Sequence, residues 1–166
     1  MLLPLSVTSP EVADRPDSPS VWFPPPFVYA AAVFGGLLLE RRWSLPIGGG
    51  AAGDAAGWLL AAVGAAVMFS GFGTFLRRRT SVIPHRPASS LVISGPYRLT
   101  RNPMYLGLGI MTAGFGLGFD TWWPIVLLAP AVWIIQRTVI APEEAYLRRR
   151  FGADYVEYTR RVRRWI

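Results

Sequence analysis

Residues 55–76 read AAGWLLAAVGAAVMFSGFGTFL and contain no charged side chain before the three arginines Arg77, Arg78 and Arg79. A helix needs roughly 20 apolar residues to cross the hydrocarbon core of a bilayer. This stretch has that length, and the arginines mark the point at which the chain returns to water. The sequence therefore predicts a membrane-spanning helix here, and with it the fold class of an all-α integral membrane protein.

Three further apolar segments accompany this helix. Residues 103–119 are uncharged, and residues 122–135 follow after a break at Asp120 and Thr121, so the two segments predict a tight helical hairpin. Residues 27–39 are the weakest candidate, because an apolar run of that length is as often a buried or interfacial helix. We expect about four transmembrane helices.

Small residues recur at four-residue spacing inside two of the predicted helices. Gly57, Ala61 and Ala65 share one helix face, and Gly114 and Gly118 share another. Small side chains let helix backbones approach closely in lipid, where the hydrophobic effect gives helices no reason to associate. We interpret both patterns first as packing surfaces.

The distribution of charge predicts the topology. All 17 basic residues are arginines, and residues 77–101 carry six of them without an acidic residue. Arginines that flank apolar segments are retained on the cytoplasmic side, which explains the basic composition better than a nucleic-acid partner does. We expect residues 77–101 and the tail to be cytoplasmic and the Asp120 turn to be external. Four spans would put the N-terminus inside but Arg41 and Arg42 outside; if the first segment does not cross, the N-terminus lies outside.

Composition excludes several classes of site. The chain has no cysteine and one histidine, His85, so disulfides and thiolate chemistry are absent and a typical metal site is not expected. No phosphate-binding GxxxxGK[ST] loop and no strand-led GxGxxG occurs. Residues 1–24 lack the basic start of a signal peptide and are rich in proline, serine and acidic side chains, so we expect a flexible tail before a single domain at 25–166.

Polar residues are concentrated where one face of the membrane should lie. Pro96 and Pro103 disfavour helix directly before them, so residues 95–102 should be irregular and leave backbone groups free for a ligand. Glu143 and Glu144 follow the hairpin, where a carboxylate close to lipid indicates function. They could equally cap a helix that begins at Pro142, or pair with Arg148.

The tail predicts an amphipathic helix lying along the membrane interface, interrupted at Gly152. Its apolar side chains recur at helical spacing, with the arginines on the other face: Leu147, Phe151, Tyr155, Tyr158 and Val162.

Two separated motifs resemble a known family. Residues 91–107, LVISGPYRLTRNPMYLG, and residues 143–165, EEAYLRRRFGADYVEYTRRVRRW, are similar to the isoprenylcysteine carboxyl methyltransferase and phospholipid methyltransferase family of integral membrane enzymes. The resemblance implies a helical bundle that holds S-adenosylmethionine at the cytoplasmic face, within residues 77–166, releases S-adenosylhomocysteine, and receives a lipid-like acceptor laterally from the bilayer. Carried over position by position, the cofactor contacts of the family fall on Ser89, Ser90, Leu91, Val92, Tyr97, Asn102, Pro103, Met104, Tyr105, Glu143 and Glu144.

The chain departs from the family pattern at two positions. Asn102 stands where the family commonly has histidine, so a proton-transfer role there is not expected. Val139 stands where the prenylcysteine enzymes have an arginine for the substrate carboxylate. Arg137 is the nearest candidate for a substrate contact, but two residues of displacement rotate it by about 200° around a regular helix.

The acceptor and the catalytic residue stay open at this level. A carboxylate acceptor needs no general base, whereas an amine or thiol must lose a proton, for which His85, Glu143, Glu144 or a tyrosine are candidates. Two other classes compete with a methyltransferase: a sterol-reductase-like membrane oxidoreductase using NADPH, and a non-catalytic membrane subunit whose basic tail binds anionic lipid.

Overall fold

The computed structural model describes residues 24–78 and 90–166. Its elements are α1 (Pro25–Arg42), α2 (Gly50–Arg78), the 3-10 turn η1 (Gly95–Arg98), α3 (Pro103–Gly118), α4 (Trp123–Ile135), the π-helical turn η2 (Gln136–Ile140) and α5 (Ala141–Arg161). The expected flexible tail, His85 and Ser89 lie outside the described residues, apart from Pro24 at the end of the tail.

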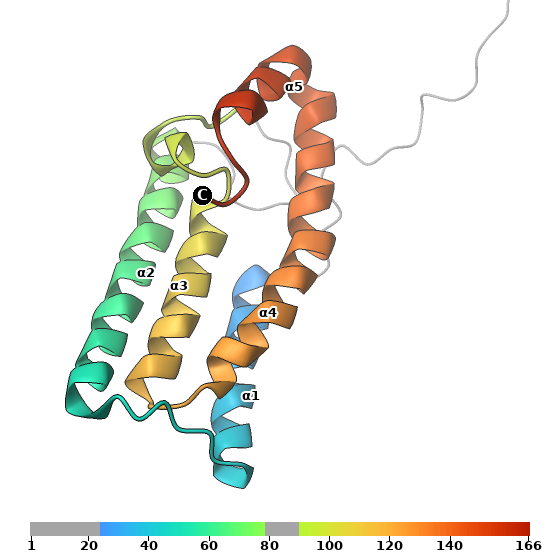
Figure 1. Cartoon of the computed structure of the whole chain (residues 1–166). Coiled ribbons are helices and arrows are strands. Elements are labelled where there is room, and N and C mark those ends of the chain that lie inside the picture. The colour runs from blue at the N-terminus through green and yellow to red at the C-terminus, as the bar shows by residue number, and fades with distance from the viewer. Residues whose placement is uncertain (1–23, 79–89) are drawn as a thin grey trace, which may run out of the picture.

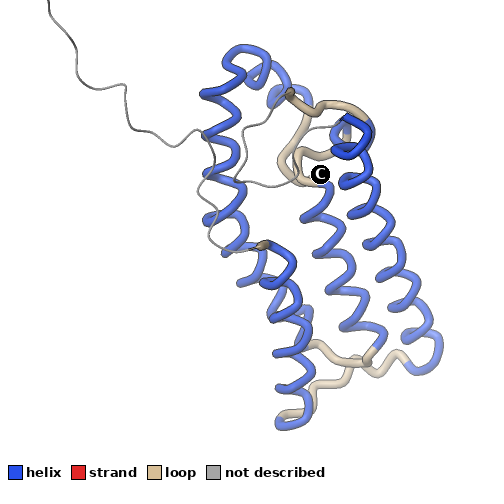
Figure 2. Tube along the Cα trace, turned by 180° about the vertical axis from the view of Figure 1, so that it is seen from behind, coloured by secondary structure: helices blue, strands red, loops and turns tan. Residues whose placement is uncertain are grey.

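The helices form a bundle of two packed pairs. α2 and α3 lie side by side along most of their length, α1 packs against α4, and α3 contacts both members of the second pair (Figure 1). The view from behind shows helices joined by loops (Figure 2), and the described residues contain no β-strand beyond an isolated bridge between Pro46 and Thr121. The all-α prediction is confirmed for the described parts of the chain.

Two helices among the described residues are long and apolar enough to cross a membrane. One covers Gly50–Arg77 and the other Trp123–Arg161, which is α4 continued through η2 into α5. α3 has 16 residues, or about 24 Å of helix, which is shorter than the hydrocarbon core. α1 carries Glu40, Arg41 and Arg42 at its end. Two candidate spans are therefore present, and the count of four stays a prediction.

Glycines allow the backbones of α2 and α3 to lie close together. A Cβ atom added at Gly57 would collide with the backbone at Gly118, and one at Gly114 would collide with the backbone of Ala61. Gly64 and Gly107 face each other's helix in the same way. The expectation that small residues form a packing surface is confirmed.

The loops at the end of the bundle where α3 meets α4 are held by two carboxylates. Glu40 accepts hydrogen bonds from the Ser44 hydroxyl at 2.6 Å and the Thr121 hydroxyl at 2.7 Å. Asp120, which has a positive φ of 51°, accepts the backbone N–H of Gly48 at 2.8 Å. The predicted hairpin break at Asp120 and Thr121 is confirmed, and its side chains tie the α3–α4 turn to the α1–α2 loop.

The structure corrects the expected start of the tail helix at Pro142. The helix is continuous from α4 into α5, and η2 places a π turn directly before Pro142. Proline lacks a backbone N–H and its ring clashes with the carbonyl four residues earlier, and the wider π turn accommodates both effects. Glu143 and Glu144 therefore do not sit at a free helix N-terminus, and the interpretation of these residues as caps is wrong.

Candidate active site

The first wall of the site is the segment from Ser90 to Asn102. Residues 95–102 were expected to be irregular, but Gly95–Arg98 form one 3-10 turn that begins at Gly95, whose φ is 61°. This turn buries Tyr97, whose ring meets the Phe75 ring edge-on at 5.5 Å between centroids. Burial, followed by the nearby Glu143 carboxylate and Tyr158 hydroxyl, raises the pKa of Tyr97 well above its usual value. Tyr97 thus stays protonated near neutral pH and is no candidate for the general base.

The second wall is α5, which bends sharply at Gly152. The backbone angles there, φ 51° and ψ −120°, are non-helical and turn the second half of α5 back towards the first wall (Figure 1). The predicted break at Gly152 is confirmed. The apolar stripe of the tail is confirmed as well, but it packs against protein: Tyr155, Tyr158 and Val162 are buried, and partly buried Leu91 packs against them.

One hydrogen bond joins the two walls directly. The Tyr158 hydroxyl donates to the backbone carbonyl of Tyr97 at 2.7 Å, across 61 positions of sequence. The two polar segments that the sequence places far apart therefore meet at one end of the bundle, opposite the loops held by Glu40 and Asp120 (Figures 1 and 2).

A cavity of about 60 Å³ lies between the two walls. Small-molecule sites commonly enclose about 300–1,000 Å³, so a nucleoside would require the walls to separate further than they do here. The cavity is lined by Phe75, Ser90, Leu91, Val92, Tyr97, Arg101, Asn102, Ile140, Glu143, Glu144, Leu147, Tyr155 and Tyr158.

Glu144 is the centre of an ion-pair network at the rim of this cavity. Arg164 binds it with two donors, Nε at 3.0 Å and Nη2 at 2.6 Å. The Nη1 of Arg101 lies 3.0 Å from the same carboxylate. The pair with Arg148 that the sequence offered is not among the ion pairs of the described residues. Both oxygens of Glu144 are therefore engaged by arginines of this chain.

The chain after α5 runs along the first wall and fixes its conformation. The backbone N–H of Arg101 donates to the carbonyl of Arg163 at 3.0 Å. The carbonyl of Arg164 accepts the Thr100 hydroxyl at 3.0 Å and the Asn102 side-chain amide at 2.9 Å. The side-chain amide of Asn102 thus has a partner within the protein, although the residue also lines the cavity.

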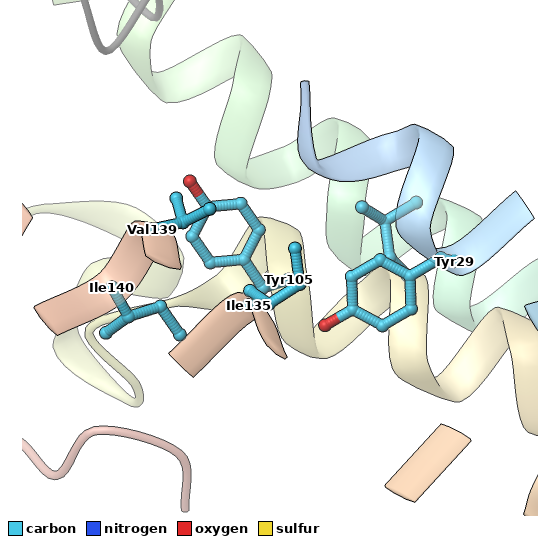
Figure 3. Packing of buried hydrophobic residues seen from close by; sticks show 6 residues of the cluster. Tyr29, Tyr105, Ile135, Val139 and Ile140 are labelled. Carbon is cyan, nitrogen blue, oxygen red and sulfur yellow. The ribbon is translucent and has the colours of Figure 1, made fainter. Parts of the chain in front are cut away.

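Glu143 lies at the same cavity but outside the arginine network. It accepts a hydrogen bond from the Tyr105 hydroxyl, and among the described residues no cation forms an ion pair with it. The ring of Tyr105 belongs to a buried cluster with Tyr29, Ile135, Val139 and other apolar side chains (Figure 3). Glu143 is therefore a carboxylate that lines the cavity without a cationic partner, and the hydroxyl of buried Tyr105 orients it.

Tyr105 also lines an apolar groove of about 280 Å³. Its walls come from the start of α1, from α2 and from the start of α3: Pro25, Pro26, Met68, Phe69, Phe72, Met104, Tyr105 and Leu108. Tyr105 therefore lines the apolar groove and also contacts Glu143, a residue of the polar cavity.

The structure brings together most of the residues to which the resemblance assigned cofactor contacts. Seven of them line the cavity: Ser90, Leu91, Val92, Tyr97, Asn102, Glu143 and Glu144. Met104 and Tyr105 line the apolar groove instead, and Pro103 is buried at the start of α3. Arg137 is exposed, with its guanidinium 5.9 Å from the ring centroid of Trp133, and does not line the cavity.

Some cavity residues were not among the sequence-based candidates. Tyr155, Tyr158 and Leu147 were recognised only as members of the amphipathic stripe, and their spacing carried no sign that the stripe would face a site. Arg101 lies within the motif of residues 91–107, but in the sequence its charge indicates only the membrane topology. Phe75 lies near the end of α2, and nothing in its local sequence separates it from the other aromatic residues of that helix.

The described residues contain no group of three or more histidine, aspartate or glutamate side chains able to hold a metal ion. The chemistry available at the cavity is therefore that of two carboxylates, one arginine and three tyrosines.

Comparisons with known proteins point to a family. The sequence model described as Phospholipid methyltransferase matches residues 53–154, which is more than half of the chain and runs from α2 into the first half of α5. Protein-S-isoprenylcysteine O-methyltransferase B of Arabidopsis thaliana is 36% identical over 72 residues, which cover 43% of this chain and 36% of that protein. The match thus spans little more than a third of the relative. No solved structure matches the chain.

Proposed function

The chain belongs to the phospholipid methyltransferase family, and from this premise we propose that it is a membrane-embedded methyltransferase that takes a methyl group from S-adenosylmethionine. The acceptor is a lipidic or small apolar molecule that reaches the site from the bilayer. The cofactor site lies at the cytoplasmic end of the bundle, where the arginine-rich segments gather.

The observation that carries this proposal is the convergence of two distant segments on one cavity. Residues of the first wall, such as Tyr97, and residues of α5, such as Glu143, line the same space although about fifty positions separate them. Irregular backbone near membrane depth is tolerated where it lines a cavity. The cavity also combines aromatic surface with a carboxylate that lacks a cationic partner.

The residues present fit the charge of S-adenosylmethionine. Its sulfonium and α-ammonium groups are cationic, and the charged groups lining the cavity are two glutamates and one arginine. Glu143 would hold the ammonium or the ribose hydroxyls by a charge-assisted hydrogen bond. The Tyr97 ring would offer an aromatic face to the adenine or the sulfonium.

When bound, the cofactor supplies an electrophilic methyl group on a sulfonium. Transfer to an anionic nucleophile cancels that cationic charge, and transfer to a neutral amine moves it to the nitrogen. The residues of the chain therefore need to position the reactants and exclude water more than to stabilise additional charge. Tyr105 orients Glu143 through its hydroxyl, and the buried tyrosines of α5 shield the cavity from solvent. Tyr97 stays protonated and is excluded as the general base. Among the described candidates, Glu143 and Glu144 line the cavity and are left to accept the proton that an amine or thiol acceptor must lose.

The two positions expected to supply a cation for an acceptor carboxylate do not supply one, which favours an amine or thiol acceptor. Val139 occupies the position at which the prenylcysteine enzymes carry an arginine for the carboxylate, and it is buried in the core with 1% exposure. Arg137, the nearest alternative, is exposed, and its guanidinium lies over the ring of Trp133. Neither residue provides the cation that recognition of an acceptor carboxylate requires.

The apolar groove beside Tyr105 suits the hydrocarbon part of such an acceptor. It is lined almost entirely by apolar side chains, and exposed Phe69 and Phe72 form its outer edge on α2. An acceptor lying there would present its polar end towards Tyr105 and Glu143.

Ligand-binding calorimetry on the solubilised protein tests the proposal. We expect micromolar binding of S-adenosylhomocysteine, and loss of this binding in Glu143→Ala, where the unpaired carboxylate is removed. Glu157→Ala is the matched control, because Glu157 is an exposed glutamate on the same helix that pairs only with surface arginines. Binding of NADPH in its place would identify a reductase-like protein, and binding of neither would identify a non-catalytic subunit.

A further inference from the structure

Arg101 has more hydrogen-bonding capacity than its partners within the protein use. Its Nη1 contacts Glu144 at 3.0 Å and lies 3.5 Å from the Tyr155 hydroxyl. Its Nε, however, is buried and has no hydrogen-bond partner. A buried donor without a partner costs about 1–3 kcal/mol, so such groups in a native fold call for an explanation.

The location of Arg101 indicates which kind of group its unused donor binds. The residue lines the cavity, and only 15% of its side chain is exposed to solvent. A guanidinium presents five donors in a planar fork that matches the two oxygens of a carboxylate or the oxygens of a phosphate. Glu144 and the Tyr155 hydroxyl both contact Nη1, so the Nε donor is left for a ligand that enters between the two walls.

Glu143 supplies the complementary charge at the same cavity. Its carboxylate pairs with the Tyr105 hydroxyl and with no cation among the described residues. A cavity wall that offers both an incompletely used guanidinium and a carboxylate without a cation matches a ligand carrying an anion and a cation close together. The α-amino acid end of S-adenosylmethionine is such a zwitterion.

We propose that Arg101 binds the α-carboxylate of the methyl donor while Glu143 binds its α-ammonium group. This assignment rests on the proposed function and extends it to a residue outside the set of expected cofactor contacts. Glu144 and Arg164 take a supporting role: their two-point ion pair holds Glu144 against Arg101 and so fixes the orientation of the guanidinium.

The same network explains why two adjacent glutamates are present. Glu144 is neutralised by Arg101 and Arg164, which leaves Glu143 as the carboxylate available to a cationic ligand group. Without Glu144, the guanidinium would lose its anchor and the second arginine would lose its partner.

Two related nucleosides distinguish binding of the amino acid end of the ligand from binding of its nucleoside part. S-adenosylhomocysteine and 5′-methylthioadenosine share the adenine, the ribose and a neutral thioether sulfur, but only the first carries the α-amino acid. Calorimetric dissociation constants for both compounds are measured on the full chain in detergent micelles, for the wild type, Arg101→Gln, Arg101→Lys and Arg98→Gln. Arg98 is the control, since it is an exposed arginine three residues earlier.

We expect Arg101→Gln to weaken S-adenosylhomocysteine binding by about 10- to 100-fold and to leave the affinity for 5′-methylthioadenosine within about threefold. Arg101→Lys keeps a charge for Glu144 but lacks the fork, so it should show a smaller loss of the same selectivity. Arg98→Gln should bind both compounds as the wild type does. The retained binding of 5′-methylthioadenosine also reports that the variants are folded.

The results that would overturn the assignment of Arg101 differ from the result that would refute the proposed function. Unchanged S-adenosylhomocysteine binding in Arg101→Gln, or an equal loss for both compounds, overturns the assignment of Arg101 and leaves the proposed function in place. Unchanged cofactor affinity with a raised KM for the acceptor would place an acceptor phosphate or carboxylate at Arg101 and likewise overturn it. A wild type that binds neither compound refutes the proposed function, and the assignment falls with it.

Discussion

Glu144 binds two arginines at once, and this single residue joins α5, the first wall and the segment after α5. Arg101 and Arg164 both lie within 3.0 Å of its oxygens, and the carbonyl of Arg164 in turn accepts hydrogen bonds from Thr100 and Asn102. The carboxylate is partly buried, with 15% of the side chain exposed. Solvent therefore screens these pairs less than it screens the surface pairs of Glu157.

Replacing this carboxylate tests the network at the residue scale. Glu144→Gln leaves two arginines without their charged partner, and we expect a loss of about 1–3 kcal/mol in the free energy of unfolding. Thermal or denaturant unfolding in detergent measures it. Glu157→Gln breaks only exposed pairs and should stay within about 0.5 kcal/mol of the wild type. Equal effects of both substitutions would show that the network contributes no more than surface pairs do.

Two buried tyrosines offer a second comparison (Figure 3). The Tyr105 hydroxyl donates to Glu143, whereas the Tyr29 hydroxyl is buried without a partner. Tyr105→Phe should weaken S-adenosylhomocysteine binding by about tenfold, because it removes the group that orients Glu143. Tyr29→Phe should leave binding unchanged and hold or raise the unfolding midpoint, since an unsatisfied buried hydroxyl is lost. Calorimetry and thermal unfolding on both variants check this, and a loss of binding in Tyr29→Phe would contradict it.

Individual site residues were predictable where their local sequence is unusual. Glu143 is a carboxylate next to an apolar span, and Tyr97 belongs to a proline-bounded motif, so the sequence alone indicates a functional role for each. Arg164 and Phe75 did not, because their roles arise only when distant segments meet. The pairing of Glu144 with Arg101 and Arg164, rather than with Arg148, likewise depends on the fold-back at Gly152.

At the scale of elements, the contact between α2 and α3 depends on glycines that have no room for a side chain. Gly64 faces the backbone of Met111 and Gly107, and a Cβ there would collide with both. Lipid offers helices little hydrophobic reason to associate, so close backbone packing supplies much of the attraction. The position of α3, and hence of the first wall attached to its start, is fixed by this contact.

A pair of glycine substitutions in α2 isolates this effect. Gly64→Ala should force the helices apart and lower the free energy of unfolding by about 1–3 kcal/mol. Gly73→Ala, in the same helix, meets no atom within 4 Å and should leave stability unchanged or raise it slightly, since alanine is the better helix former. Thermal unfolding in detergent distinguishes them. Similar midpoints for both variants would mean that the α2–α3 contact is not glycine-limited.

Two of the four predicted apolar segments match their helices closely, whereas α2 begins at Gly50, five residues before the predicted segment 55–76. The predicted segments 103–119 and 122–135 agree with α3 and α4 to within a residue. Pro142 suggested a new helix because proline is common in a first turn. The structure instead continues α4 through a π turn into α5, a solution that apolar periodicity cannot reveal because it changes the register by less than a turn.

At the scale of the whole molecule, the two ends of the bundle differ in chemistry. One end carries the cavity, the arginine network and α5, and the other carries the loops held by Glu40 and Asp120 (Figure 2). The sequence predicted this polarity from the arginines alone, because charge asymmetry decides orientation in a bilayer. It could not decide whether α1 and α3 cross, since their lengths and end charges lie near the limit for spanning.

The absence of cysteine makes this arrangement directly testable. A single cysteine at exposed Ala51, near the start of α2, should react with a membrane-impermeant maleimide from the side opposite to one at exposed Arg149 in α5. Labelling of right-side-out and inverted vesicles measures the side, with Arg149→Cys expected to be cytoplasmic. Detergent-solubilised samples control for accessibility. Reaction of both cysteines from one side would show that α2 does not cross the membrane.

The groove beside Tyr105 lies on the flank of the bundle, between the starts of α1 and α3 and the end of α2. A lipid occupying it would never have to leave the leaflet in order to react. The quantity that governs saturation would then be the mole fraction of acceptor within the bilayer. Adding inert phospholipid at a fixed total amount of acceptor should slow turnover by surface dilution, as expected for an enzyme whose encounters take place in two dimensions.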